Sequence, residues 1–234
     1  MDSDDRADAE PNMTVLDDLR RLCVELSELL WKVHKSDGAG PRLIFPARRD
    51  GIARISEQES RILLCQLLES SSWFYSVESP TLRTYKQQGK TAISGRSDVS
   101  LYASHRPDSK RANVELKAHG KIDIEDFRKD FEKVLREDID VLWFHTLENT
   151  DRGTIPNVFS KIRKAFALLK KEIDGRTHSI VFAFCVVERK ELWFTTVALS
   201  GSADEQLRRI DDTLNNAHLL LRPPGAGWAV HRRS

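Results

Sequence analysis

Short β-prone segments alternate with amphipathic helical segments along most of this chain. The expected strands cover residues 73–77, 98–103, 112–117, 141–147, 180–187 and 192–199. The expected helices cover residues 14–35, 56–69, 124–135, 156–172 and 204–221. A helix with one apolar face must bury that face against another layer, and the strands supply such a layer. The order of elements therefore predicts an α/β domain, in which helices flank a mixed β-sheet.

The expected domain boundaries follow changes in composition along the chain. Its 234 residues suit one compact domain with small additions better than two full domains. Residues 1–13 are expected to form a disordered acidic tail, and residues 14–50 an N-terminal helix and a loop. The α/β domain is expected to span residues 51–221. Residues 222–234 are basic and rich in Pro and Gly, and are expected to form a C-terminal tail.

Charge balance, cysteines and the N-terminus limit the classes of protein that fit. The 37 Lys and Arg nearly balance the 36 Asp and Glu, which argues against a chain that coats nucleic acid by bulk charge. The 3 cysteines lie far apart in apolar stretches, as buried free thiols of a reducing compartment do. The N-terminus lacks the apolar core of a secretory signal, and no apolar run could span a bilayer. These features predict a cytoplasmic protein with no membrane association.

Two expected strands, 98–103 and 112–117, carry a polar face opposite an apolar one. Side chains alternate between faces along a strand, so the polar face holds Asp98, Ser100, Tyr102, Asn113, Glu115 and Lys117. A hairpin symmetric about its loop would set Asp98 opposite Lys117 and Ser100 opposite Glu115. Asp98 and Glu115 would then be diagonal neighbours, with Cβ atoms roughly 7–8 Å apart.

Two carboxylates at that separation can converge on one Mg²⁺ ion. A metal held in this way polarises a phosphoryl oxygen and lowers the pKa of bound water, and a nearby lysine stabilises developing negative charge. The alternative is a solvated strand face with a cross-strand Asp98–Lys117 ion pair. The glycine-bearing turn before Asp98, the flanking helices and the otherwise apolar strand favour the metal site.

Ser97-Asp98 followed by Glu115-Leu116-Lys117, in the order helix, three strands, helix and strand, resembles the PD-(D/E)xK nuclease superfamily. The resemblance covers roughly residues 56–147, and Ser97 stands where the motif has proline. It implies a restriction-endonuclease-like sheet in which Asp98 and Glu115 bind Mg²⁺, for which Mn²⁺ can substitute. In this family the lysine, here Lys117, assists the attacking water.

Members of this superfamily often place an acidic residue of the first core helix near the metal. Glu59 is the candidate for this role in catalysis and metal binding, and Glu57 is its rival. The alternative for Glu59 is a capping box with Ser56, in which the hydroxyl caps a backbone amide and the glutamate reaches back. The sequence favours neither reading of Glu59.

Three further residues are candidates for contact with nucleic acid beside the site. His119 lies two residues past Lys117 and would extend the same strand face, and Lys129 and Lys133 lie on the polar face of the next helix. A structural histidine and an ordinary solvated helix face are the alternatives. The expected function is a Mg²⁺-dependent endonuclease, with DNA favoured over RNA, of a bacterial branch that serves a defence or mobile-element system. A second copy or a separate protein is its expected partner. The alternative is a catalytically silent scaffold of the same fold.

Overall fold

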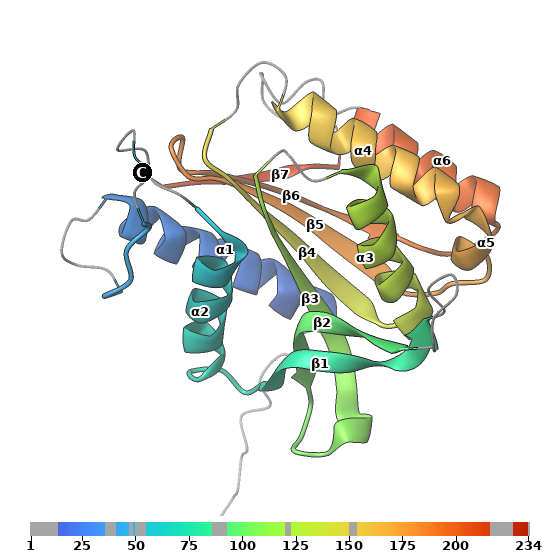
Figure 1. Cartoon of the computed structure of the whole chain (residues 1–234), viewed down its shortest axis with the longest axis horizontal. Coiled ribbons are helices and arrows are strands. Elements are labelled where there is room, and N and C mark those ends of the chain that lie inside the picture. Colours follow the sequence, from blue (N-terminus) through green and yellow to red (C-terminus); the bar gives the residue numbers. More distant parts are fainter. Residues whose placement is uncertain are drawn as a thin grey trace, which may run out of the picture.

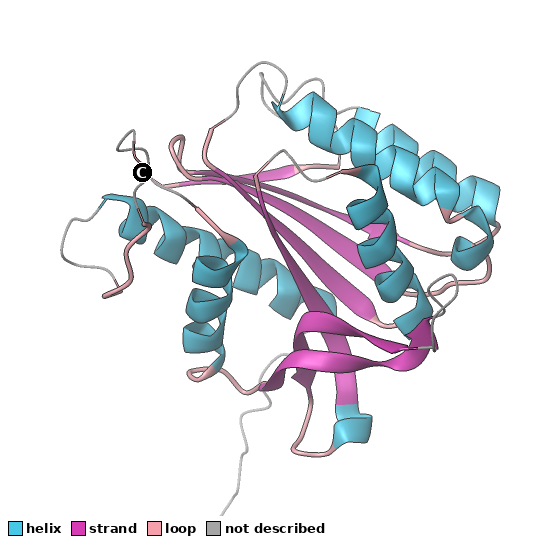
Figure 2. Ribbon diagram, in the orientation of Figure 1, coloured by secondary structure: helices cyan, strands magenta, loops and turns pink. Residues whose placement is uncertain are grey.

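The computed structural model describes residues 14–35, 41–46, 49, 55–85, 93–119, 123–149, 154–215 and 227–233 (Figure 2). Its helices are α1 (Val15–Lys35), α2 (Glu57–Leu68), α3 (Ile124–Glu137), α4 (Thr154–Leu168), α5 (Lys170–Ile173) and α6 (Ala203–Asn215), with a 3₁₀ turn η1 (Pro107–Ser109). Its strands are β1 (Phe74–Tyr85), β2 (Ile93–Tyr102), β3 (Lys110–Ala118), β4 (Asp140–Leu147), β5 (Ser179–Val186), β6 (Glu191–Ala198) and β7 (Ala229–Arg232). The acidic tail expected at residues 1–13 lies outside the described residues.

The described strands form one seven-stranded mixed sheet in the order β1-β2-β3-β4-β5-β6-β7 (Figure 1). The pairs β3–β4 and β4–β5 are parallel, and the other neighbouring pairs are antiparallel. Parallel neighbours need a crossover connection, which α3 supplies between β3 and β4, and α4 with α5 between β4 and β5. The predicted α/β domain with a mixed sheet between helices is therefore confirmed.

Helices cover both faces of the sheet and divide the core in two (Figure 1). One apolar cluster joins α1 and α2 to the sheet, and a second joins α3, α4 and α6 to the other face. Both central parallel strands are buried along nearly their whole length, as parallel strands covered on two faces must be. Among the described helices, none has the length and apolarity needed to cross a membrane.

Helix α1 lies inside this core rather than beside it. Leu19, Leu26 and Trp31 are fully buried in the same cluster as Ala183 of β5. The helix expected at the start of residues 14–50 is present as α1, and its apolar face covers the sheet. Loop residues 36–40, 47–48 and 50 lie outside the described part of the chain.

Two strand boundaries also differ from the sequence predictions. Strand β1 does not stop before Pro80 but runs through it to Tyr85, because β1 is an edge strand, where a proline is tolerated. The expected C-terminal tail contains β7, which pairs with β6. Trp228, only 8% exposed, packs on Phe159 and Phe184 and anchors that strand.

The hairpin of β2 and β3 has a different register from the symmetric one expected. Ser100 pairs with Asn113 and Val99 with Val114, a shift of two residues. The cause lies in the connection, where Ser109 binds the backbone of Arg106 and Ala103, and a bulge separates Leu101 from Tyr102. The prediction that Asp98 lies opposite Lys117 is therefore wrong.

Candidate active site

Asp98 and Glu115 lie level with each other where β2 and β3 part. They come one step beyond the Val99–Val114 pair, so both point to the face that carries α3. The neighbouring polar pair is closed, because the hydroxyl of buried Ser100 donates to Oδ1 of Asn113 at 2.7 Å. The two carboxylates are thus brought to the same level on neighbouring strands, and the charge of Asp98 acts on Glu115.

Glu115 is the most buried acid of this group, at 1% exposure. Its Oε2 accepts a hydrogen bond from Lys133 Nζ at 3.1 Å, while its Oε1 is buried without a hydrogen-bond partner. Burial raises the pKa of Glu115 to about 8, and the nearby carboxylates of Asp130 and Asp98 add to the rise against the opposing effect of Lys133. A buried carboxylate oxygen without a donor calls for a cation, a proton or a water.

Asp98 uses both carboxylate oxygens. Its Oδ1 lies 2.6 Å from Arg61 Nη2, and its Oδ2 accepts the backbone N–H of Leu116 at 2.7 Å. The second contact replaces the backbone ladder at the point where the strands separate. Asp98 is therefore fixed in orientation beside Glu115, with its charge matched by Arg61 rather than by Lys117.

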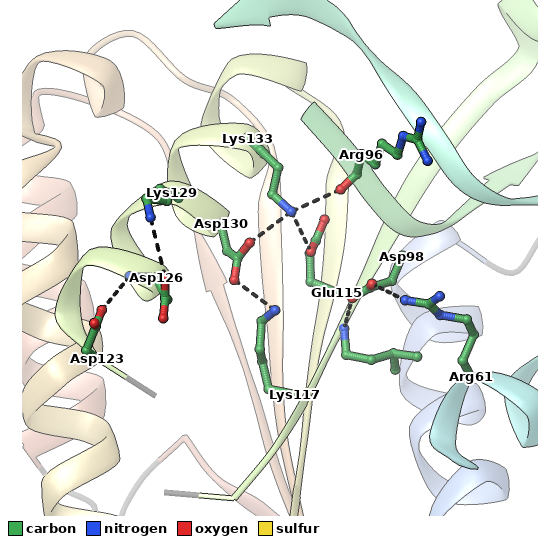
Figure 3. Close-up of polar contacts among 11 residues, drawn as sticks. Arg61, Arg96, Asp98, Glu115, Lys117, Asp123, Asp126, Lys129, Asp130 and Lys133 are labelled. Atoms are coloured by element: carbon green, nitrogen blue, oxygen red, sulfur yellow. Dashed lines mark hydrogen bonds and ion pairs between the residues drawn. The ribbon is translucent and has the colours of Figure 1, made fainter. Parts of the chain in front are cut away.

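Asp130 of α3 lies between two lysine ammonium groups (Figure 3). Its Oδ2 is 2.8 Å from Lys117 Nζ, and its Oδ1 is 2.9 Å from Lys133 Nζ. Burial alone would raise the pKa of Asp130, but these two ammonium groups lower it. Burial alone would lower the pKa of Lys117, yet Asp130, Glu57 and Glu115 raise it. Lys117 therefore stays a cation in the neutral pH range, held over the site by α3.

The two acids of α2 have different surroundings. Glu59 accepts the backbone N–H of Ser56 at 2.9 Å and also binds the Ser56 hydroxyl, so the capping box is present. Glu57 instead lies within the electrostatic reach of Lys117, Asp98 and Asp130, and its pKa is raised chiefly by burial. The charges of the site therefore act on Glu57, whereas Glu59 is engaged in the capping box.

The three expected nucleic-acid contacts divide. Lys133 is in the site, where it also donates to the backbone oxygen of Arg96 at 3.0 Å. Lys129 is not, because its side chain is 58% exposed and its ammonium lies 3.5 Å from Asp126 (Figure 3). The expectation that His119 extends the strand face is wrong, because β3 ends at Ala118 and His119 has a φ of 68°. Its backbone oxygen lies 2.7 Å from Nε2 of His145.

Among the described residues, no three Asp, Glu, His or Cys side chains form a ready-made metal cage. Mg²⁺ does not require one, since it commonly binds one or two carboxylates together with waters and substrate phosphates. Asp98 and Glu115 offer that pair of carboxyl groups, and Oε1 of Glu115 has no hydrogen-bond partner within the protein. The donor set therefore fits a hard divalent cation, with Arg61 and Lys133 as its competitors for the two carboxylates.

The sequence interpretation missed two members of the site, Asp130 and Arg61. Asp130 precedes Lys133 by three residues, and that spacing could have grouped the two on one side of α3. Arg61 follows Glu57 by four residues, and that spacing could have grouped the two on one side of α2. Neither spacing indicates which strand that side of the helix will pack against.

Comparison with known proteins adds no family assignment. No family model matches the chain, and no curated protein matches it. A crystal structure of the central domain of yeast acetyl-CoA carboxylase is similar with a TM-score of 0.31 and 10% sequence identity. The match covers 78% of this chain and 34% of that one, so this chain spans about a third of its length. A similarity this low supports no conclusion about function.

Proposed function

We propose that this chain is a Mg²⁺-dependent nuclease that hydrolyses phosphodiester bonds at Asp98, Glu115 and Lys117. The observation that carries the proposal is buried Glu115 with its unpartnered oxygen, near partly exposed Asp98 and beside a lysine held as a cation. Arrangements of this kind that perturb several pKa values in one place are typical of catalytic sites. The resemblance to the PD-(D/E)xK superfamily gives the same assignment to the same three residues.

Asp98 and Glu115 would hold the divalent cation, with Glu57 as the candidate third acid. Such an ion supplies Lewis-acid polarisation of the phosphoryl oxygen and lowers the pKa of a bound water. Lys117 would donate hydrogen bonds to the scissile phosphate or the attacking water rather than accept a proton, because its pKa is raised. Asp130 would position Lys117. Lys133 would contact a phosphate of the substrate after its ammonium group moves away from Glu115.

DNA as the substrate, internal cleavage and a role in a defence or mobile-element system come from the superfamily resemblance alone. A partner, either a second copy or another protein, has the same basis. These points specify which substrates to test first. They add nothing to the geometry that supports the cation site.

The test is cleavage of plasmid, linear duplex, single-stranded DNA and RNA by the full chain with Mg²⁺ or Mn²⁺. Asp98→Asn, Glu115→Gln and Lys117→Met should each lower cleavage by about 10²-fold or more. Glu132→Gln is the matched control, because Glu132 lies on α3 and forms ion pairs with Arg128 and Arg136. Cleavage that survives in folded Glu115→Gln protein would refute the assignment.

A catalytically silent scaffold of the same fold is the second candidate. It is favoured by one observation, that Arg61 and Lys133 already contact the two carboxyl groups of the candidate site. The two functions differ in a direct measurement. A folded chain that neither binds Mg²⁺ or Mn²⁺ in calorimetry nor cuts any of the four substrates would support the scaffold.

A further inference from the structure

Arg61 of α2 ties together carboxylates from two neighbouring strands. Its Nη2 lies 2.6 Å from Asp98 on β2, and its Nη1 lies 2.7 Å from Glu78 on β1. The Arg61 and Asp98 side chains are 15% and 14% exposed, so water screens this contact only partly. Arg61 thus closes the candidate site on the side of α2 (Figure 3).

Three acidic residues lie at the same level of the backbone on β1, β2 and β3. The pairs Val77–Val99 and Ser79–Ser97 lie on either side of Glu78 and set it level with Asp98, which is itself level with Glu115. Like charges directly opposite each other on neighbouring strands repel. Glu78 also has a φ of 53°, a left-handed conformation that is unfavourable for a residue other than glycine. A cation between Glu78 and Asp98 compensates this arrangement, and in the structure Arg61 supplies it.

We propose that Arg61 is a latch that withholds Asp98 from a divalent cation until its guanidinium leaves the carboxylate. This inference rests on the proposed function and concerns the regulation of the same site. Both Asp98 oxygens are engaged in the structure, whereas Glu115 keeps one free. A divalent cation on Asp98 would have to share the carboxylate with the positive guanidinium, which like charge opposes.

The contacts that hold Arg61 in place are incomplete, so its guanidinium can leave Asp98 at a limited cost. Nε of Arg61 is buried and has no hydrogen-bond partner, so the guanidinium does not recover all the hydration that it lost. The Glu78 side chain is 43% exposed, and water competes for that end of the contact. A substrate phosphodiester, whose two oxygens can accept hydrogen bonds from the guanidinium, would favour the state in which Arg61 has left Asp98.

The experiment is titration of the full chain with Mg²⁺ alone and with Mn²⁺ alone, followed by calorimetry. Arg61→Gln should bind either ion at least tenfold more tightly than the natural chain, because Asp98 becomes available. The double variant Arg61→Gln/Asp98→Asn should lose this gain. Arg96→Gln is the matched control, since it removes an exposed charge next to the site whose side chain points away from Asp98 (Figure 3). It should change the affinity less than twofold.

A second readout needs no substitution. In the natural chain, the ¹⁵N–¹H resonance of Arg61 Nε should shift when Mg²⁺ binds, because the guanidinium leaves Asp98. This measurement decides the matter even if Arg61→Gln fails to fold. An unchanged resonance during binding that depends on Asp98 would overturn the latch.

The outcomes also separate the latch from the nuclease proposal. Binding that is lost in Asp98→Asn but not tightened in Arg61→Gln would overturn the latch and leave the metal site standing. Equal tightening in Arg96→Gln would show general electrostatics and overturn it too. Absence of binding in every folded variant would refute the cation site itself, and with it the nuclease.

Discussion

The strongest quantitative prediction concerns Glu115 and the pH dependence of Mg²⁺ binding. Burial raises the pKa of this carboxyl to about 8, so most molecules carry a proton on it at neutral pH. A metal ligand must be deprotonated, and binding therefore has to expel that proton. Raising the pH from 6 to 9 is the perturbation, and no substitution is needed to apply it.

The size of the effect follows from that pKa. Below pH 8 the apparent Mg²⁺ affinity should rise about tenfold for each pH unit, and above pH 8 it should level off. Close to one proton should be released per ion at pH 7, and close to none at pH 9. Without metal, the raised pKa means that the folded state holds the proton more tightly than the unfolded chain. The contribution of Glu115 to stability is therefore largest below its usual pKa of 4.5 and is lost as the pH rises to about 8.

The assay is calorimetry at each pH in two buffers with different enthalpies of ionisation, which counts the protons released. Glu132→Gln, on α3 but paired with Arg128 and Arg136, should reproduce the natural profile. Affinity that is flat from pH 6 to 9, or binding that releases no proton at pH 7, would refute the role given to Glu115. Retention of the full pH slope in Glu115→Gln would refute it equally.

Two further predictions separate structural acids from those of the site. Glu59→Ala should cost about 1 kcal/mol of stability by breaking the capping box and should leave Mg²⁺ affinity unchanged, whereas Glu57→Gln should weaken Mg²⁺ binding. Thermal unfolding measures the stability of both variants, and calorimetry measures their Mg²⁺ affinity. The reverse pattern would make Glu59 the metal-binding acid. Glu137→Gln should lower the free energy of unfolding by about 3–5 kcal/mol without affecting the site, because it leaves the Lys110 side chain, only 6% exposed, without its buried carboxylate. Denaturant unfolding measures this change, and a loss under about 1 kcal/mol would contradict the prediction.

The parts of the fold that the sequence predicted are those set by local periodicity. The helices α1, α2 and α3 and the strands β3, β4, β5 and β6 match their expected segments closely, and the capping box at Ser56 is present. Each has a strong apolar period or a cap that depends on residues within a few positions. Pattern alone therefore sufficed for the fold class and for the face that carries Glu115.

The features that the sequence did not predict depend on contacts between distant segments. Pro80 remains within a strand because β1 has a neighbour on one side only, and the sequence does not reveal which strand lies at an edge. Strand β7 forms because Trp228 reaches the core and β6 offers a free edge. In both cases tertiary context overrides a local signal that is correct in isolation.

The register of β2 and β3 shows that a sequence can predict the face on which a side chain lies and still not predict its ion-pair partner. A slip of one residue would have moved Asp98 to the other face of the sheet, but the actual shift of two keeps it on the face of Glu115. The same shift moves Lys117 away from Asp98, and Lys117 pairs with Asp130 instead. Asp98 is then matched by Arg61 from a helix that the hairpin pattern did not include. Alternation therefore identifies which side chains share a site, whereas ion-pair partners, and with them the latch, depend on register and helix packing.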